Sequence, residues 1–287
     1  MKRLVLLGLV GFILMGVTPV LADGDFYVIS GGAGAVGTKI SSLPYTINKP
    51  GFYYVTGNLT IVPKVETLFG ITVKSDNVTI DLMGFSLNGF QYYNQTYGIY
   101  IYSQKNVEIR NGTVRGWDTG ISGGGSTHRV INVRVEGNNE GINLSATCSL
   151  VKGCVALDNY NSGIITYAST VSGNQVINCH EGIATRGGLS IVSNNMVTNC
   201  KHGIDANGTI SGNVVNDSEE YGISCTWSGS LIGNSVYMKS GIGIRLSSGE
   251  GNVLVDQNNV TGSGTPYSDG NSTTVWGKNA GLPPPPP

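Results

Sequence analysis

Charged residues are scarce in this sequence, and neither sign is in excess. Only 12% of the 287 residues are Asp, Glu, Lys or Arg, and 17 basic residues stand against 18 acidic ones. Proteins that bind nucleic acid through its phosphates present a basic patch or stripe. The composition offers no surplus of Lys or Arg for such a patch, so no nucleic-acid partner is expected.

Helical patterns and long apolar runs are also lacking. No window combines twelve residues at a 3.6-residue apolar period with a capping residue. The apolar run Leu4–Val17 follows two basic residues, precedes the small-residue site Val20–Ala22, and is shorter than the ~20 residues of a membrane span. We interpret residues 1–22 as a secretory signal peptide cleaved near Ala22-Asp23. The mature chain is then expected to be secreted or periplasmic, with no stable membrane span.

Glycine, by contrast, is abundant, and nine of the 43 glycines begin a recurring Gly-Ile pair. After a first gap of 28 residues, the pairs follow at spacings of 22, 21, 22, 19, 21, 19 and 21 residues. A fixed period of about 20 residues is typical of a solenoid, in which each repeat buries its apolar face against its neighbours. The pairs begin at Gly70, Gly98, Gly120, Gly141, Gly163, Gly182, Gly203, Gly222 and Gly243.

A second apolar series repeats in step with these pairs. It consists of Leu87, Val114, Val135, Val155, Val176, Val197, Val215, Val236 and Val260. Residues that favour tight turns separate the two series, as in Ser172-Gly173-Asn174. Short alternating runs such as Val73–Leu82 favour strands. Three short strands and three turns in about 20 residues correspond to one coil of a parallel β-helix.

The Gly-Ile repeat with its Ser-Gly-Asn turns resembles the right-handed parallel β-helix, or pectin-lyase-like, superfamily. The opening coil, Gly70–Gly89, is similar to the first coils of many secreted bacterial members. The resemblance implies an all-β fold, a right-handed parallel β-helix solenoid of about nine coils. Members include polysaccharide lyases and hydrolases, alginate epimerases, phage tailspikes and periplasmic copper-accessory proteins. Because one fold hosts so many chemistries, the function must be argued from the site.

The segments that flank the repeats differ from them in composition. Residues 23–66 contain strand-like runs and are predicted to form an N-terminal cap, with room for one degenerate coil, over the open strand edges of the solenoid. The repeats themselves are assigned to residues 67–263. Residues 264–287 are predicted to be a flexible tail that ends in polyproline, which has no internal hydrogen bonds to support a core.

One cluster of polar residues is a candidate catalytic group. The residue before each glycine forms an outward row in which Glu181 and His202 are neighbours, close enough for a hydrogen-bonded acid–base pair. Arg186 and Asp205 are expected about 8 Å apart at Cα, within reach of a salt bridge. With Lys201 these groups could transfer protons.

A structural role for this cluster is the alternative, since exposed turns of a solenoid carry ordinary ion pairs. The paired aspartates of related hydrolases, the calcium-binding aspartates of lyases and the Asp-Pro-His motif of epimerases do not occur in the sequence. Catalysis is therefore left open, with a polysaccharide lyase or a glycoside hydrolase as the activity if there is one.

Aromatic residues gather in the first repeats. They are Tyr92, Tyr93, Tyr97, Tyr100, Tyr102 and Trp117. Flat aromatic faces stack on sugar rings, and clusters of exposed aromatics mark binding surfaces. Packing over the junction between cap and coils is an equal alternative. The sequence thus predicts a secreted β-helix protein that binds or processes a polysaccharide or cell-surface glycan, with binding favoured over processing. The alternatives are a non-catalytic surface or structural scaffold and a periplasmic metal-accessory protein.

The metal-accessory alternative depends on two of the five cysteines. Cys179 and Cys200 hold the same place in successive coils, with His180 and His202 close behind. Stacked thiols, a disulfide and a soft-metal site are all compatible with this placement. The spacing matches no compact zinc signature. No metal site and no cofactor are therefore assigned.

Overall fold

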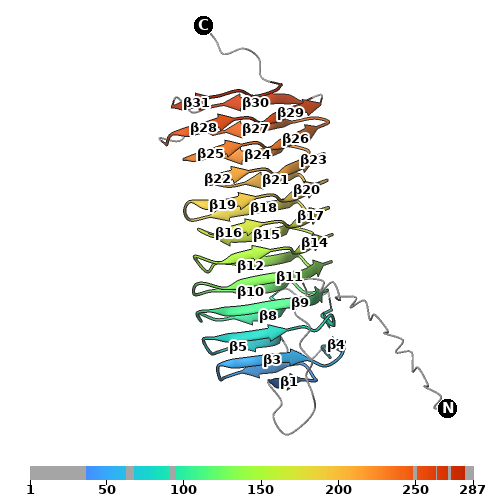
Figure 1. Cartoon of the computed structure of the whole chain (residues 1–287). Helices are drawn as coiled ribbons and strands as arrows, with labels where there is room; N and C mark the ends of the chain where they lie inside the picture. The colour runs from blue at the N-terminus through green and yellow to red at the C-terminus, as the bar shows by residue number, and fades with distance from the viewer. Residues whose placement is uncertain are drawn as a thin grey trace, which may run out of the picture. The chain divides into compact units, whose positions relative to one another are not determined.

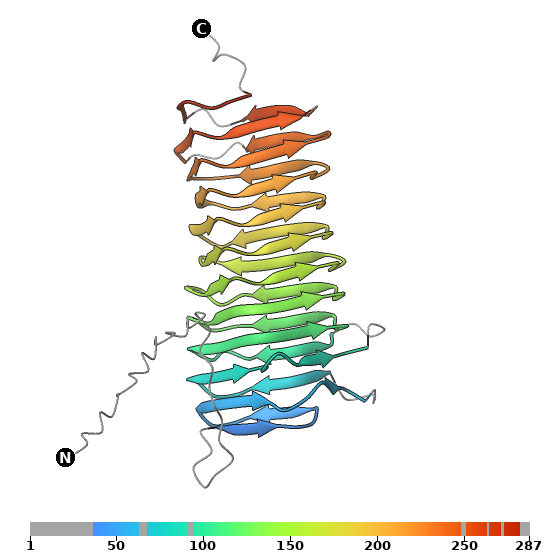
Figure 2. The ribbon, with the colours of Figure 1, turned by 45° about the vertical axis from the view of Figure 1, so that its right-hand side comes forward.

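Parallel strands of successive coils stack on one another in the computed structural model (Figures 1 and 2). It describes residues 37–62, 68–90, 95–247, 251–262, 264–270 and 273–281, which lie in one compact unit. Each regular coil gives one strand to an 11-stranded sheet and two to a 20-stranded sheet, so the predicted parallel β-helix is confirmed. The described residues form strands and turns, and no helix among them is long and apolar enough to cross a membrane.

The 11-stranded sheet takes the first strand of each coil. Its members are β2 (Tyr45–Ile47), β5 (Phe69–Val73), β8 (Tyr97–Ile101), β10 (Thr119–Gly123), β12 (Glu140–Leu144), β15 (Ser162–Tyr167), β18 (Glu181–Arg186), β21 (His202–Asp205), β24 (Tyr221–Cys225), β27 (Ile242–Leu246) and β30 (Thr265–Asp269).

The 20-stranded sheet takes the remaining strands, and β9 and β11 run through both of its strand sets. Its members are β1 (Thr38–Ile40), β3 (Gly51–Val55), β4 (Leu59–Thr60), β6 (Val78–Asp81), β7 (Ser86–Asn88), β9 (Val107–Arg115), β11 (Arg129–Glu136), β13 (Leu150–Lys152), β14 (Val155–Leu157), β16 (Thr170–Ser172), β17 (Gln175–Ile177), β19 (Ser190–Ser193), β20 (Met196–Thr198), β22 (Gly208–Ser211), β23 (Val214–Asn216), β25 (Gly229–Ile232), β26 (Ser235–Met238), β28 (Val253–Asp256), β29 (Asn259–Gly262) and β31 (Thr274–Trp276).

The isoleucines of the Gly-Ile pairs form one column of the core. From Ile71 to Ile244 each is aligned with its neighbour in the adjacent coil and is 0% exposed. The glycine of each pair is required by close packing. A Cβ built on Gly182 would lie 2.5 Å from the carbonyl oxygen of Gly203 and 2.6 Å from a methyl group of Val197. The two sequence series are therefore one steric unit.

The second column of the core follows the predicted series in all but one coil. There Ala156, not Val155, points inward and is aligned with Val135 and Val176. Val155 is only half-buried, because Cys154 takes the buried corner position and strand alternation then turns the next residue outward.

The stack extends beyond the predicted repeats at both ends. β1–β4 lie within the segment predicted to be the cap, and β30 and β31 lie within the predicted tail. These coils lack a Gly-Ile pair, because Tyr45 and Tyr267 take the isoleucine position, aligned with Ile71 and Ile244. The predicted signal peptide and cleavage site, the first part of the predicted cap and the polyproline segment lie outside the described residues.

A ladder of buried asparagines joins the coils at the corner between the two strand sets of the larger sheet. Each side-chain amide donates to a main-chain carbonyl and, except in the half-buried last member Asn279, to the Oδ1 of the next asparagine. Each Oδ1 accepts from the main-chain N–H of the equivalent residue in the preceding coil, which is Cys154 for the first member, Asn174. The members are Asn174, Asn195, Asn213, Asn234, Asn258 and Asn279. Buried polar groups of the turns are thereby paired from coil to coil.

Replacing Asn195 by Ala should lower the free energy of unfolding by about 2 kcal/mol or more. The change removes the acceptor for the N–H of Asn174 and the donor to the carbonyl of Val171, both at 3.0 Å, and leaves these buried groups unpaired. Chemical denaturation measures the effect. Asn216→Ala is the control, because the Asn216 side chain is half-buried and has no described hydrogen bond. Equal losses in the two variants would contradict the role of the ladder.

Candidate functional site

The outer side of the 11-stranded sheet, called here the sheet face, carries most of the predicted site residues. Two rows of side chains run along it, with about 4.8 Å between neighbours. The first row is Phe69, Tyr97, Thr119, Glu140, Ser162, Glu181, His202 and Tyr221. The second row is Thr72, Tyr100, Ser122, Asn143, Ile165, Ala184, Asp205, Ser224 and Arg245.

An aromatic patch, made of Phe69, Tyr97, Tyr100 and Tyr102, occupies the N-terminal end of the sheet face. The Phe69 and Tyr97 rings are stacked with centroids 5.4 Å apart, and Tyr100 lies 4.9 Å from Tyr97 and 4.8 Å from Tyr102. Tyr102 is 44% exposed. The Lys74 ammonium lies 5.4 Å from the Tyr102 ring centre. The patch thus offers contiguous ring surface next to a cation.

Trp117 does not belong to this patch, contrary to the sequence-based expectation. It is 1% exposed, and its indole N–H donates to the carbonyl of Leu87 inside the core at 3.2 Å. Tyr92 and Tyr93 lie outside the described residues. Phe69 was missed, although its place directly before the first Gly-Ile pair puts it in the same outward row as Tyr97.

The four candidate catalytic residues share the other end of the sheet face, with different partners from those predicted. Glu181 accepts a hydrogen bond from Arg186 at 2.9 Å, and His202 contacts Glu220 at 2.9 Å. The predicted Glu181–His202 and Arg186–Asp205 pairs do not form. The Arg186 side chain folds back along its own strand to Glu181, and Asp205 lies opposite Ala184.

Glu220 completes this end of the sheet face, and sequence reasoning did not select it. Its carboxylate also contacts Lys201 at 2.9 Å. Lys201 and Glu220 are joined through the main chain of successive coils, so opposite charges at matching turn positions were the available signal. Burial raises the pKa of the Asp205 carboxyl, while the charges of Arg186, Arg245 and His202 act in the opposite direction.

Tyr221 and Arg245 extend the cluster towards the C-terminal coils. The His202 and Tyr221 rings are stacked at 4.5 Å with an interplanar angle of 10°. The Arg245 guanidinium lies 3.9 Å from the Tyr221 ring centre and donates to the Ser224 hydroxyl. Tyr221 is 4% exposed, and burial raises its pKa. The tyrosine therefore serves as a flat, neutral support for the rings and charges beside it.

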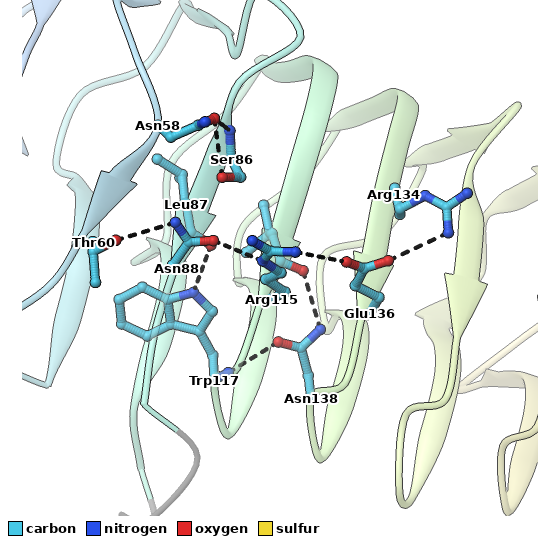
Figure 3. A network of polar contacts seen from close by, with 11 residues as sticks. Asn58, Thr60, Ser86, Leu87, Asn88, Arg115, Trp117, Arg134, Glu136 and Asn138 are labelled. Atoms are coloured by element: carbon cyan, nitrogen blue, oxygen red, sulfur yellow. Dashed lines mark hydrogen bonds and ion pairs between the residues drawn. The ribbon is translucent and has the colours of Figure 1, made fainter.

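A hollow of about 610 Å³ lies elsewhere, beside the end of the second strand set. It is lined by Asn88, Gly89, Arg115, Gly116, Glu136, Gly137 and Asp158. Figure 3 shows the row that borders it: Arg115 donates to Asn88 and to Glu136, and Arg134 donates to the other oxygen of Glu136. Because both arginines are already paired with the Glu136 carboxylate, the hollow is a weaker candidate than the sheet face.

The two stacked cysteines lie inside the coils. Cys179 and Cys200 are 5% and 1% exposed, and all five cysteines are free thiols. The hydrogen bond between the two thiols and their burial raise the pKa of Cys200. Within the part of the chain that is described, no group of three or more His, Cys, Asp or Glu side chains could hold a metal ion.

Comparison with known proteins gives one family and two similar structures. Residues 55–208 match the family model described as periplasmic copper-binding protein (NosD). No curated protein sequence matches. The crystal structure of the Dettilon tailspike protein (gp208) is similar, with a TM-score of 0.62 and 15% identity over 85% of this chain and 61% of the tailspike chain. This chain therefore spans less than two thirds of the tailspike.

The second similar structure is the A-module of the mannuronan C-5 epimerase AlgE4 from Azotobacter vinelandii. Its TM-score is 0.55, with 12% identity over 80% of this chain and 86% of the module. At these identities the two structures show the fold alone, which is that of the right-handed parallel β-helix superfamily. The family model includes β5–β21 and therefore most of the sheet face.

The Glu220 carboxyl should titrate with a pKa of about 2, because the hydrogen bonds from Lys201 and His202 favour its ionised form. A folded-state pKa below the ordinary value of 4.5 stabilises the folded chain above pH 4.5, and this contribution is lost as the pH falls towards 2. NMR titration of the side-chain carboxyl measures the pKa. Lys201→Ala should raise it, and Lys152→Ala, on the other sheet, should not. An unchanged midpoint in the Lys201 variant would contradict this assignment.

Proposed function

Because the chain belongs to the family of periplasmic copper-binding proteins (NosD), whose model spans residues 55–208, we propose that it acts in the periplasm, where it binds polysaccharide along the sheet face. The observation that carries this proposal is the aromatic patch. Three tyrosines and a phenylalanine lie ring against ring on an outward surface rather than in the core. Sugar rings have apolar faces that stack on such rings, with hydroxyl groups left for polar partners at the rim.

Polar side chains with fixed geometry continue the surface beyond the patch. Asn143 donates to Glu140 at 2.8 Å, and Thr119 lies opposite both Tyr97 and Glu140. From Tyr97 on β8 to His202 on β21 the first row advances five strand spacings, about 24 Å. An extended oligosaccharide of several units matches a surface of this kind better than a single sugar does.

The comparison with solved structures supports a glycan ligand only through the fold. One neighbour is, by its title, an epimerase of the polysaccharide mannuronan. Binding without turnover fits the sheet face better than catalysis, because Glu181 and His202 are each engaged by another partner. Proton transfer by Glu181, Arg186, His202 and Asp205 remains a prediction.

Replacing Tyr100 and Tyr102 together by Ala should weaken glycan binding about thirtyfold, because each lost ring removes a stacking contact of about 1 kcal/mol. A glycan array identifies the ligand, and affinity electrophoresis measures the loss. Tyr237→Ala is the matched control, since Tyr237 is also 44% exposed but lies on β26 of the other sheet.

Glu181→Gln separates binding from catalysis. Binding should persist in this variant. Product formation that collapses in Glu181→Gln while the two tyrosines are dispensable would favour an enzyme. If no glycan binds and no variant has a phenotype, a structural scaffold is the better description.

A second candidate function, metal accessory protein, is suggested by the family description. Copper(I) prefers thiolate ligands, and Cys179 and Cys200 are the stacked thiols of the described chain. Both are buried, and His180 and His202 project from the turn and the sheet face rather than towards the thiols' interior position. The described residues therefore do not fit a closed copper site of three or four ligands.

Elemental analysis of the purified protein tests this alternative. Wild type and Cys179→Ser should both contain no stoichiometric copper or zinc, because the thiols are packing groups. Stoichiometric metal in the wild type that is lost in the variant would contradict that expectation and favour the accessory role.

A further inference from the structure

His128 is a buried histidine at the corner where its coil enters the larger sheet. Its side chain is 1% exposed. Nδ1 lies 3.3 Å from the main-chain nitrogen of Val107, and Nε2 lies 2.7 Å from the carbonyl oxygen of Gly124. Because a carbonyl oxygen only accepts hydrogen bonds, Nε2 carries the proton, and Nδ1 accepts from the Val107 N–H. The ring is therefore neutral, and both of its nitrogens are engaged.

The next three coils have serine in the place of His128. Ser149, Ser169 and Ser190 follow it at the same corner, and each hydroxyl accepts from the main-chain N–H of the preceding member. A hydroxyl accepts this hydrogen bond at every pH, whereas Nδ1 of a histidine cannot accept it once it is protonated. His128 is thus the titratable member of this column of four.

The two partners of the ring connect it to the turn of residues 102–107, which begins at Tyr102 of the aromatic patch. Val107 ends the turn and begins β9. Gly124 contacts its beginning, because the Gly124 N–H donates to the Tyr102 carbonyl at 3.0 Å. The Tyr102 ring packs edge-on against Tyr100 at 4.8 Å. The histidine therefore holds a turn whose first residue supplies part of the aromatic patch.

Protonation of His128 is incompatible with the contact at Val107. The new proton on Nδ1 would face the Val107 N–H, so two donors would oppose each other, and a charge would be placed in a buried site. Burial accordingly lowers the pKa of His128 below its ordinary value of 6.5, while the hydrogen bond to Gly124 and the charge of Asp76 act in the opposite direction.

The charged groups around the ring do not offer it a direct ion pair. Among the described residues no carboxylate oxygen lies within 4.0 Å of its nitrogens. Asp76 is engaged by the turn itself, because its Oδ1 accepts from the main-chain N–H of Lys105 at 2.8 Å. Glu108 and Arg129 pair with each other at 2.7 Å. The charged or titratable groups on the elements packed against the ring are Lys74, Asp76, Lys105, Glu108, Arg129 and Cys148.

We propose that His128 is an acid-sensitive clamp of the turn 102–107, so that a falling pH opens this turn and weakens glycan binding at the aromatic patch. The clamp stands without the proposed function, on which only its effect on a glycan rests. In the open turn the ring reaches solvent and titrates near its ordinary pKa of 6.5. Because the closed turn binds the proton less readily than the open turn, its stability is complete above pH 6.5 and is lost as the pH falls below that value.

Amide hydrogen exchange of the full-length chain, followed by NMR between pH 7.5 and pH 5, tests the clamp. After correction for the intrinsic exchange rate, protection of the Val107 N–H in the wild type should fall by up to about tenfold per pH unit below 6.5, because opening binds one proton. His128→Ser, which copies Ser149, and His128→Gln, which keeps a donor and an acceptor, should abolish this dependence. His180→Gln, at an exposed histidine, should behave like the wild type, and the Asn195 N–H is the reference whose protection should not change.

Binding to amorphous cellulose, an insoluble and uncharged polysaccharide, tests the link to the aromatic patch. Sedimentation with the polymer should show binding by the wild type that weakens in step with Val107 protection, and binding by His128→Gln that is the same at both pH values. Protection of Val107 that does not depend on pH in the wild type, or a dependence that persists in both His128 variants, overturns the clamp. Polymer binding that stays constant while protection falls overturns its link to the patch. Absence of polymer binding at every pH contradicts the proposed function instead, and the exchange experiment still decides on the clamp.

Discussion

The hydrogen bonds between successive coils are the constraint on which the rest of the structure depends. Main-chain amides of each coil pair with carbonyls of the next in both sheets, and the asparagine ladder extends this pairing through a corner where the strands are interrupted. Every coil must therefore follow nearly the same path. Side chains at equivalent positions are stacked at about 4.8 Å, and a residue that suits one coil suits its neighbours.

This constraint makes the core and the sheet face two sides of one pattern. The alternation that buries Ile183 and Ile204 turns the next residues, Ala184 and Asp205, to the outer side of the same strands. A solenoid with short turns has no deep cleft walled by loops, so recognition depends on rows of side chains instead. The aromatic patch and the ring support of Arg245 are such rows, at opposite ends of the sheet face.

The repeat pattern in the sequence predicted the positions of the strands and of the outward rows. It did not predict which partners individual side chains contact. The Gly-Ile pairs located the strands and the outward rows, because the glycine of each pair packs against the valine of its own coil and against the main chain of the next coil. Register could not reveal that Arg186 turns to Glu181 or that His202 contacts Glu220, since long side chains select partners by rotamer. Trp117 was wrongly assigned to the exposed aromatic residues, because a tryptophan in a turn is expected to be exposed. Its ring instead enters the core, where it packs beside three glycines. The end coils lie outside the predicted repeats because tyrosine replaces the isoleucine of the Gly-Ile pair there.

Because equivalent coils are stacked, the length of the sheet face changes only by whole coils, each of which adds one strand spacing. Removing one complete coil between β12 and β18 would bring the aromatic patch and Arg245 closer by one strand spacing without changing the immediate surroundings of either. Duplicating a coil would move them apart by the same step. The gain or loss of whole coils would thus change the distance between the two ends of the sheet face in steps of one strand spacing. Related chains could in this way match polymers whose sugar units repeat at different distances.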